Sequence, residues 1–472
     1  MARAALKPRE IASISTSPAW EHQVESVKFF KTRERGFDNS APGTGKTMVQ
    51  VETYRNRAKP RGRWLIVCPK TLMVAAWGED IEKFAPELTV SFATAENREA
   101  AFQAPTDVVV INTDGVKWLV EKKNEKFLKQ FDHLTIDEYT SFKHPTSQRA
   151  KAMVKLRKYF KYRYGMSGTP NPNTVMELFN PALIIDDGKR LGTSFYKLRN
   201  VMQAPEQIGP SPDHLKWEDR PGATQAVHEL LQDITIRHPF SVMKHVPANH
   251  KDVKRFDLSP RAKKIYDKMA LECLVAFDDG PPVNAVHAAS LRTKLLQIAS
   301  GAVYDGSEAG SYKLVDTTRY ELVCDLAEEA QHSVVFFNWT HQRDFLVKEL
   351  DKRGLSFAVI DGSTPQTSRD RIVVDYQAGK YRTILLHPRT GAHGLTLTRG
   401  DTTIFCSPIY EADLMEQGIA RIHRGSQDKV THTIFIEAKN TVEAKVYDRL
   451  NQKHAAMQDL LDQQAHKKKE SK

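Results

Sequence analysis

The segment Ala41-Pro42-Gly43-Thr44-Gly45-Lys46-Thr47 decides how the chain is expected to fold. Its glycines let backbone N–H groups turn inward around phosphate oxygens, Lys46 offers a charge to the β and γ phosphates, and the Thr47 hydroxyl offers a ligand to magnesium. We expect Thr47 to open a helix whose N-terminal dipole also attracts phosphate. Two details depart from the general pattern, because Ser40 stands where glycine is usual and residues 36–39 make a poor buried strand. The segment still predicts the phosphate loop of a nucleotide-binding domain.

A phosphate loop needs a second, acidic site, which the segment His133-Leu134-Thr135-Ile136-Asp137-Glu138 provides. Asp137 is the candidate magnesium ligand, and Glu138 is the candidate general base that orients and polarises water. An Asp-Glu pair after an apolar run is, taken alone, usually a strand-end cap. Its order after the phosphate loop favours ATP hydrolysis.

Two arginines near the C-terminus, Arg421 and Arg424, are three residues apart. On a helix this spacing places both side chains on one face, from which they can reach across a cleft to the γ-phosphate. A solvated helix face is the ordinary alternative. We expect these arginines to stabilise transition-state charge, an effect typically worth about 10³ to 10⁵ in rate.

Short apolar runs recur along the chain, and each is followed by a segment with helical periodicity. Runs rich in Val, Ile and Phe are typical of buried parallel strands, so the alternation predicts an α/β fold with mostly parallel sheets flanked by helices. The runs are 64–68, 108–111, 133–136, 333–337, 357–360, 383–386, 402–406 and 432–436.

The runs fall into two groups, which predicts two lobes. We divide the chain into lobe 1 at 1–248, with a surface excursion near 204–222, lobe 2 at 249–465, and a basic tail at 466–472. Two helices, at 261–277 and 286–299, are expected within a protrusion spanning about 261–300.

The composition excludes several classes of protein. With 472 residues, 40% hydrophobic and 27% charged, the chain is neither disordered nor a small disulfide scaffold, and no apolar run reaches membrane-spanning length. The four cysteines lack metal-site or redox spacing, and no secretory signal is visible, so we expect reduced thiols and an intracellular, cytoplasmic or nucleoid-associated protein. The net charge of +11 favours a polyanionic partner, most often nucleic acid.

Together these segments resemble the motifs of the SNF2-like branch of superfamily 2 helicase-related ATPases, in order from about residue 18 to residue 455. Trp20 to Gln23 is similar to the Q motif, 41–47 to motif I, 67–70 with Trp77 and Glu79 to motif Ia, 112–113 to motif Ib, 137–140 to motif II, 167–170 to motif III, 336–340 to motif IV, 389–397 to motif V and 417–427 to motif VI. The resemblance implies two RecA-like lobes, with helical protrusions between them, and a minimal motor like bacterial or phage members.

The resemblance also implies residue roles. Gln23 would contact adenine, and Pro42, Gly43, Thr44, Gly45, Lys46 and Thr47 would bind Mg·ATP. The coupling residues would be Ser167, Thr169, Gly394 and Gln417, and the nucleic-acid contacts would be Lys70, Thr113, Lys143, Trp339, Ser363, Thr364, Arg389 and Thr396. Tyr139 and Thr140 depart from the usual motif II, and Thr396 stands where motif V usually has Asn.

We therefore expect a monomeric, ATP- and Mg²⁺-dependent translocase that moves along duplex or branched DNA, with any protein partner unknown. A strand-separating helicase on single-stranded DNA or RNA is the alternative enzyme. A nucleotide-gated DNA-binding or scaffolding protein is the non-enzyme alternative, disfavoured by the presence of Lys46, Glu138, Arg421 and Arg424.

Overall fold

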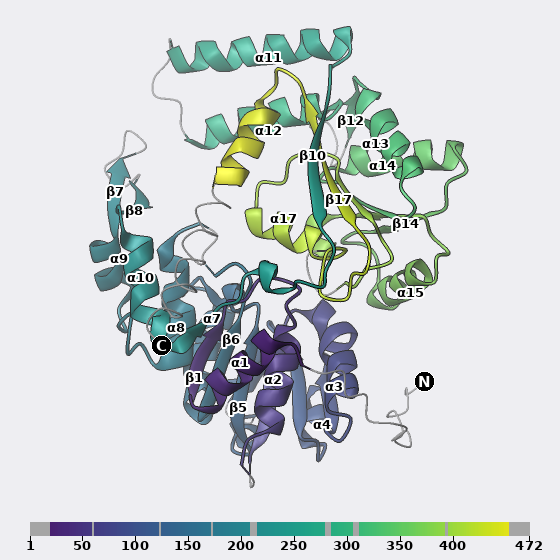
Figure 1. The fold of residues 1–472 in the computed structure, drawn as a ribbon. Coiled ribbons are helices and arrows are strands. Elements are labelled where there is room, and N and C mark those ends of the chain that lie inside the picture. The colour runs from purple at the N-terminus through teal and green to yellow at the C-terminus, as the bar shows by residue number, and fades with distance from the viewer. Residues whose placement is uncertain are drawn as a thin grey trace.

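The computed structural model contains two RecA-like α/β lobes, one above the other (Figure 1). It describes residues 19–58, 61–121, 124–170, 173–207, 215–278, 285–304, 311–391 and 395–452. The basic tail at 466–472 and Gly394, expected to act in coupling, lie outside these residues. Within the described residues no helix is both long and apolar enough to span a membrane.

Lobe 1 is built on a seven-stranded sheet of order β3-β4-β2-β5-β6-β1-β9, in which neighbouring strands are parallel. Its strands are β1 (Arg35–Asp38), β2 (Arg63–Cys68), β3 (Val90–Ala93), β4 (Val108–Asn112), β5 (Phe131–Asp137), β6 (Tyr162–Met166) and β9 (Thr235–Ile236). Its helices are α1 (Glu21–Lys31), α2 (Lys46–Arg55), α3 (Glu79–Phe84), α4 (Arg98–Gln103), α5 (Val116–Leu119), α6 (Glu125–Leu128), α7 (Gln148–Leu156), α8 (Phe179–Asp186), α9 (Phe195–Met202) and α10 (Ala223–Leu231).

Lobe 2 is built on a six-stranded parallel sheet of order β10-β17-β16-β13-β15-β14. Its strands are β10 (Asn249–Phe256), β13 (Ser333–Phe336), β14 (Phe357–Ile360), β15 (Thr383–Leu386), β16 (Thr402–Phe405) and β17 (Thr431–Ala438). Its helices are α11 (Pro260–Asp278), α12 (Ala285–Ala299), α13 (Thr318–Glu329), α14 (Thr340–Lys352), α15 (Gln366–Gln377), α16 (Pro388–Gly391) and α17 (Ala412–Ile419).

Each sheet is covered on both faces, which explains the continuous apolar runs of its central strands. In β2, Leu65 and Val67 belong to one buried cluster, whereas Trp64, Ile66 and Cys68 belong to another. The prediction of mostly parallel sheets flanked by helices is confirmed, and every apolar run assigned as a strand is one.

Besides the two large sheets, the described residues form two antiparallel hairpins. One, β7 (Gln203–Gln207) with β8 (Leu215–Asp219), lies in the expected surface excursion, and the other is β11 (Ala302–Tyr304) with β12 (Tyr312–Leu314). The protrusion contains α11 and α12, which lie at the top of lobe 2 in Figure 1.

The interpretation of residues 36–39 as a poor strand is wrong. β1 pairs with both β6 and β9, so its backbone groups have partners on each side even though Phe37 is its one large apolar residue. Gly36 fits because a Cβ there would come within 2.8 Å of the Phe30 ring.

The connection between the two sheets runs from Ile236 to Asn249. The division between lobes at 248/249 stays a prediction. Among the described side chains, Cys68, Cys324 and Cys406 are buried free thiols.

Candidate functional site

The phosphate loop joins β1 to α2. Gly43 (φ +80°) and Gly45 (φ +83°) adopt left-handed backbone conformations, which glycine allows without strain. Lys46, the first residue of α2, donates from Nζ to the carbonyls of Ser40 (2.7 Å) and Ala41 (3.2 Å). Burial lowers the pKa of Lys46, and the nearby carboxylates of lobe 1 oppose that shift. The loop therefore folds around its own lysine at the carboxyl end of β1.

Ser40 fits in the loop in place of glycine. Its N–H donates to Asp38 Oδ1 (3.0 Å), and its Oγ accepts from the backbone N–H of His238 (3.1 Å). The hydroxyl therefore ties the start of the phosphate loop to the segment that follows β9.

The acidic pair lies at the carboxyl end of β5, two strands from β1. Trp77 Nε1 donates to Asp137 Oδ2 (2.9 Å), and Ser167 Oγ donates to Glu138 Oε2 (3.1 Å). Burial raises the pKa of Asp137, and the charge of Glu138 adds to the rise. Glu138 has a φ of +52°, which is unusual for a residue with a side chain. Strain of this kind is typical of functional positions.

The segment Ser167-Gly168-Thr169 follows β6 and joins the acidic pair to the phosphate loop. Ser167 reaches Glu138 as described, and a Cβ on Gly168 would come within 2.8 Å of the Pro42 ring. The backbone N–H of Thr169 donates to Ser167 Oγ (3.3 Å). The coupling role of Ser167 and Thr169 stays a prediction.

Tyr139, a departure from the usual motif II, has a defined partner. Its hydroxyl donates to Asn39 Oδ1 (2.8 Å), and its ring packs against Phe37 at a centroid distance of 5.0 Å. Tyr139 thus links the acidic pair to β1 directly.

Gln23 and His22 of α1 both contact the phosphate loop. Gln23 Nε2 donates to the Thr44 carbonyl (3.3 Å), and its Oε1 accepts from the Trp20 N–H (3.0 Å). His22 Nε2 lies 2.9 Å from the same Thr44 carbonyl. The adenine contact of Gln23 stays a prediction, and His22 was missed because a lone histidine carries no motif.

Arg421 and Arg424 occupy turns after α17, so the expectation of one helical face is wrong. The helix ends because the Arg421 carbonyl accepts from the Leu397 N–H (2.9 Å), while the Arg421 N–H bonds Gly418 three residues back. Arg421 donates from Nε to the Gln417 carbonyl (2.7 Å), and Arg424 donates from Nη1 to Thr396 Oγ1 (2.7 Å). Burial and the charge of Arg424 lower the pKa of Arg421 to about 9.

The motif VI turn touches the phosphate loop across the lobes. The Gly425 N–H donates to the Gly43 carbonyl (3.2 Å), and a Cβ on Gly43 would lie 3.0 Å from Arg424 Cβ. His245 Nε2 lies 2.9 Å from the Gly425 carbonyl, and the His245 ring is 5.0 Å from that of Trp20. The lobes are thus in contact at the predicted ATP site, with both arginines beside it.

Asp80 of α3 is a site residue that sequence reasoning missed in favour of its neighbour Glu79, which is exposed. Burial raises the pKa of Asp80, and Arg424, Lys83 and a hydrogen bond from Thr47 oppose that rise. Asp80 is therefore near both the predicted magnesium ligand and the predicted arginine finger. Its spacing three residues after the buried Trp77, on the same face, was the available signal.

Thr47 and Asp137 suit Mg²⁺ chemically, since both offer oxygen ligands, Thr47 at the start of α2 and Asp137 at the end of β5. Among the described residues no group of three or more His, Cys, Asp or Glu side chains forms a metal cage. Mg²⁺ in phosphate sites is commonly held by one or two protein oxygens, the substrate phosphates and water. The donor set fits that mode.

The predicted nucleic-acid residues differ in exposure. Lys70, Ser363 and Arg389 are exposed, whereas Thr113 is buried. Ser363 Oγ donates to Asp361 Oδ1 (2.6 Å), which fixes the loop after β14. Thr364 Oγ1 accepts from the Asp361 N–H (3.0 Å).

Three of these residues have charged partners within the protein. Lys143 donates to Glu177 (2.6 Å), Arg389 donates to Glu411 (2.8 Å), and Thr396 accepts from Arg424. Thr396 therefore contacts Arg424, the predicted arginine finger. Trp339 is half-buried and packs beside His341.

Comparisons with known proteins identify the family of the chain. Residues 22–307 match the model of the SNF2-related domain, and residues 318–426 match that of the helicase conserved C-terminal domain. A putative protein p41 of Acyrthosiphon pisum secondary endosymbiont phage 1 is 26% identical over 442 residues, covering 89% of this chain and 92% of that protein. Chromodomain-helicase-DNA-binding protein 1-like of Mus musculus is 24% identical over 86% of this chain, which spans 45% of its length.

Two further proteins are also similar to this chain. An uncharacterized ATP-dependent helicase of Mycoplasma genitalium is 22% identical over 93% of this chain, which spans 42% of its length. The Sulfolobus solfataricus SWI2/SNF2 ATPase core in complex with dsDNA aligns over 94% of this chain and 93% of its own, with 17% identity and a TM-score of 0.43. The two family models cover most of the chain, which therefore belongs to the SNF2-related family of superfamily 2 nucleic-acid-dependent ATPases.

Proposed function

We propose that this protein is an ATP-dependent translocase that moves along duplex DNA. The observation that carries the proposal is the contact between the Gly425 N–H of lobe 2 and the Gly43 carbonyl of the phosphate loop. This contact places Arg421 and Arg424 beside the loop only while the lobes are together. Hydrolysis is then gated by lobe closure, and each cycle of closure moves one lobe relative to the other.

Within this proposal the residues have separate tasks. Lys46 and the loop N–H groups hold the phosphates, and Glu138 orients the attacking water and accepts its proton. Ser167 fixes the Glu138 carboxylate through its hydrogen bond of 3.1 Å. Thr47 and Asp137 would hold Mg²⁺, which would supply positive charge to neutralise the phosphates. Arg424 stabilises the charge that develops in the transition state, and Arg421 supports the turn that presents it.

Two properties of the chain favour DNA as its partner: its net charge and its family membership. The net charge of +11 suits a polyanion, and phosphate contacts make the affinity fall steeply with salt. Lys70 and Arg389 are exposed cations on opposite lobes, at the positions expected for backbone contacts. The mouse relative carries DNA binding in its name.

Triplex displacement tests the proposal. A translocase should strip a third strand from duplex DNA in the presence of ATP without separating the two strands of a forked duplex. Glu138→Gln is the matched control, since it should bind ATP and DNA but displace nothing. Strand separation with no triplex displacement would favour the helicase alternative. DNA binding that responds to ATP with no hydrolysis would favour the scaffolding alternative.

A further inference from the structure

A pocket of about 220 Å³ opens in lobe 2 next to the predicted nucleic-acid contacts. Loops that follow β13, β15 and β16 form it, together with Leu296 of α12 and Leu414 of α17. Pockets that enclose drug-sized ligands are commonly about 300–1,000 Å³. The volume therefore suits one planar ring system more than a whole nucleotide.

Two aromatic side chains line this pocket. Tyr410 is 50% exposed, and Trp339 is half-buried. The Trp339 ring is 6.5 Å from the His341 ring, with the planes at 15°, and 6.5 Å from the Tyr304 ring. Aromatic faces that are fixed by neighbours yet open to solvent are the usual platform for stacking nucleobases.

Polar groups of the pocket are available to a base edge and its phosphate. Asn338 Nδ2 donates to Ser407 Oγ (2.9 Å) and to the Pro408 carbonyl (2.8 Å), and in the described part of the chain its Oδ1 has no donor. The Arg389 side chain is 74% exposed and uses Nη2 for Glu411, which leaves other N–H groups for a phosphate. Asn side chains and arginines are common readers of base edges and phosphates.

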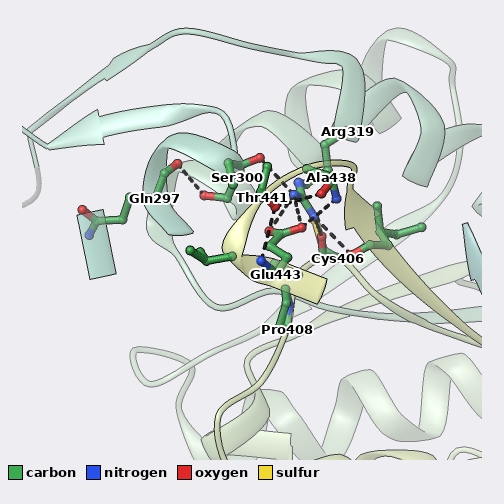
Figure 2. Close-up of polar contacts among 12 residues, drawn as sticks. Gln297, Ser300, Arg319, Cys406, Pro408, Ala438, Thr441 and Glu443 are labelled. Carbon is green, nitrogen blue, oxygen red and sulfur yellow. Dashed lines mark hydrogen bonds and ion pairs between the residues drawn. The ribbon is translucent and has the colours of Figure 1, made fainter. Parts of the chain in front are cut away.

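The pocket is supported by a buried ion pair, shown in Figure 2. Arg319 donates to Glu443 Oε1 (2.7 Å) and Oε2 (2.8 Å), and also to the carbonyl of Cys406 (2.6 Å). Glu443 and Pro408, both labelled in that view, line the pocket. Because Arg319 and Glu443 are almost fully buried, this wall is fixed before any ligand arrives.

A second support holds the aromatic side. His341 Nε2 lies 2.9 Å from Ser300 Oγ, and its Nδ1 lies 2.9 Å from the Tyr304 hydroxyl. Ser300 Oγ in turn donates to the Gln297 carbonyl (2.8 Å), a contact visible in Figure 2. The imidazole beside Trp339 is therefore held at both nitrogens.

We propose that this pocket binds the nucleobase of an unpaired nucleotide in DNA, stacked against Tyr410 and Trp339 with its phosphate near Arg389. The inference rests on the proposed DNA-directed function and adds a substrate preference to it. Removing a base from a paired stack costs a few kcal/mol, and the cost is least where the base is already unpaired. The protein should therefore prefer DNA with a bulge, mismatch or branch.

Fluorescence anisotropy with three otherwise identical duplexes tests the proposal. One is fully paired, one carries a single bulged adenine, and one carries an abasic residue at the bulge. Stacking of one base is worth about 1–3 kcal/mol, so the bulged adenine should bind about 5- to 150-fold more tightly than the abasic bulge. Tyr410→Ala should remove most of this ratio, and Tyr410→Phe should keep it because the ring remains. The matched control Tyr196→Ala, at a tyrosine 66% exposed on lobe 1, should not change it.

If the wild type bound the adenine and abasic bulges with equal affinity, the proposal that this pocket binds a nucleobase would be wrong. Loss of the ratio in Tyr196→Ala to the same extent as in Tyr410→Ala would also overturn it. Binding of the paired duplex and its stimulation of ATP hydrolysis, measured on the same preparations, report separately on the proposed function.

Discussion

Replacing Gly425 by alanine should slow ATP hydrolysis by keeping the lobes apart. The methyl group would lie 2.5 Å from Trp20 Cη2 and 2.7 Å from Met243 Cε, so something must move. Met243 Cε is the end of a flexible chain and can shift. Trp20 is held by the His22 ring at 5.8 Å and the His245 ring at 5.0 Å, so it cannot yield without breaking those contacts.

The expected size of the fall in kcat follows from this crowding. Overpacking of this kind costs about 1–3 kcal/mol, which would lower the population of the closed arrangement about 5- to 150-fold. If closure is required for hydrolysis, kcat with saturating duplex DNA should fall by a similar factor. The KM for ATP should change less, because the phosphate loop lies on lobe 1.

Steady-state hydrolysis and small-angle scattering together check this reasoning. The variant should show lower kcat and a larger radius of gyration, and Ser426→Ala, at the exposed neighbouring position, should show neither. The double variant Gly425→Ala/Trp20→Leu, compared with Trp20→Leu alone, should recover much of the lost turnover because the obstructing ring is gone. Full turnover by Gly425→Ala would refute the claim that this contact belongs to the hydrolysing form.

Three further outcomes are expected. Arg424→Ala should lower kcat by about 10³- to 10⁵-fold with little loss of nucleotide affinity, and near-normal turnover would assign the finger to another residue. Arg319→Ala should lower the free energy of unfolding by about 3–5 kcal/mol, measured with urea, because it leaves the Glu443 carboxylate buried without its partner. Burial lowers the pKa of His341 from 6.5 to about 4, so the unfolded chain binds more protons between these values. Stability should therefore be full above pH 6.5 and fall as the pH drops toward 4, and a His341→Gln variant should show a shallower fall in urea titrations.

The parallel sheets were predictable where strands are apolar and buried on both faces. Val108 to Ile111 in β4 and Thr383 to Leu386 in β15 are examples. β1 and β6 were missed because Gly36 and Gly165 interrupt them, and their pairing with each other supplies the stability that their composition does not. β10 was missed because an edge strand needs few apolar residues.

The candidate site was predictable as motifs but not as an assembly. Lys46, Asp137 and Glu138 stand out because one strand or helix end presents each of them. The Arg421 turn was not predictable, because the Leu397 N–H that competes for its carbonyl is distant in sequence. The contact between the Trp20 and His245 rings was likewise not predictable, because these residues are distant in sequence.

The most direct test of the account is ATP hydrolysis by the wild type and Glu138→Gln, measured side by side at fixed salt. The parallel samples contain no nucleic acid, single-stranded DNA, blunt duplex DNA, branched DNA or duplex RNA. Duplex or branched DNA should strongly stimulate hydrolysis by the wild type and not by Glu138→Gln, which should still bind ATP. Stimulation confined to single strands or RNA, or normal hydrolysis by Glu138→Gln, would contradict it.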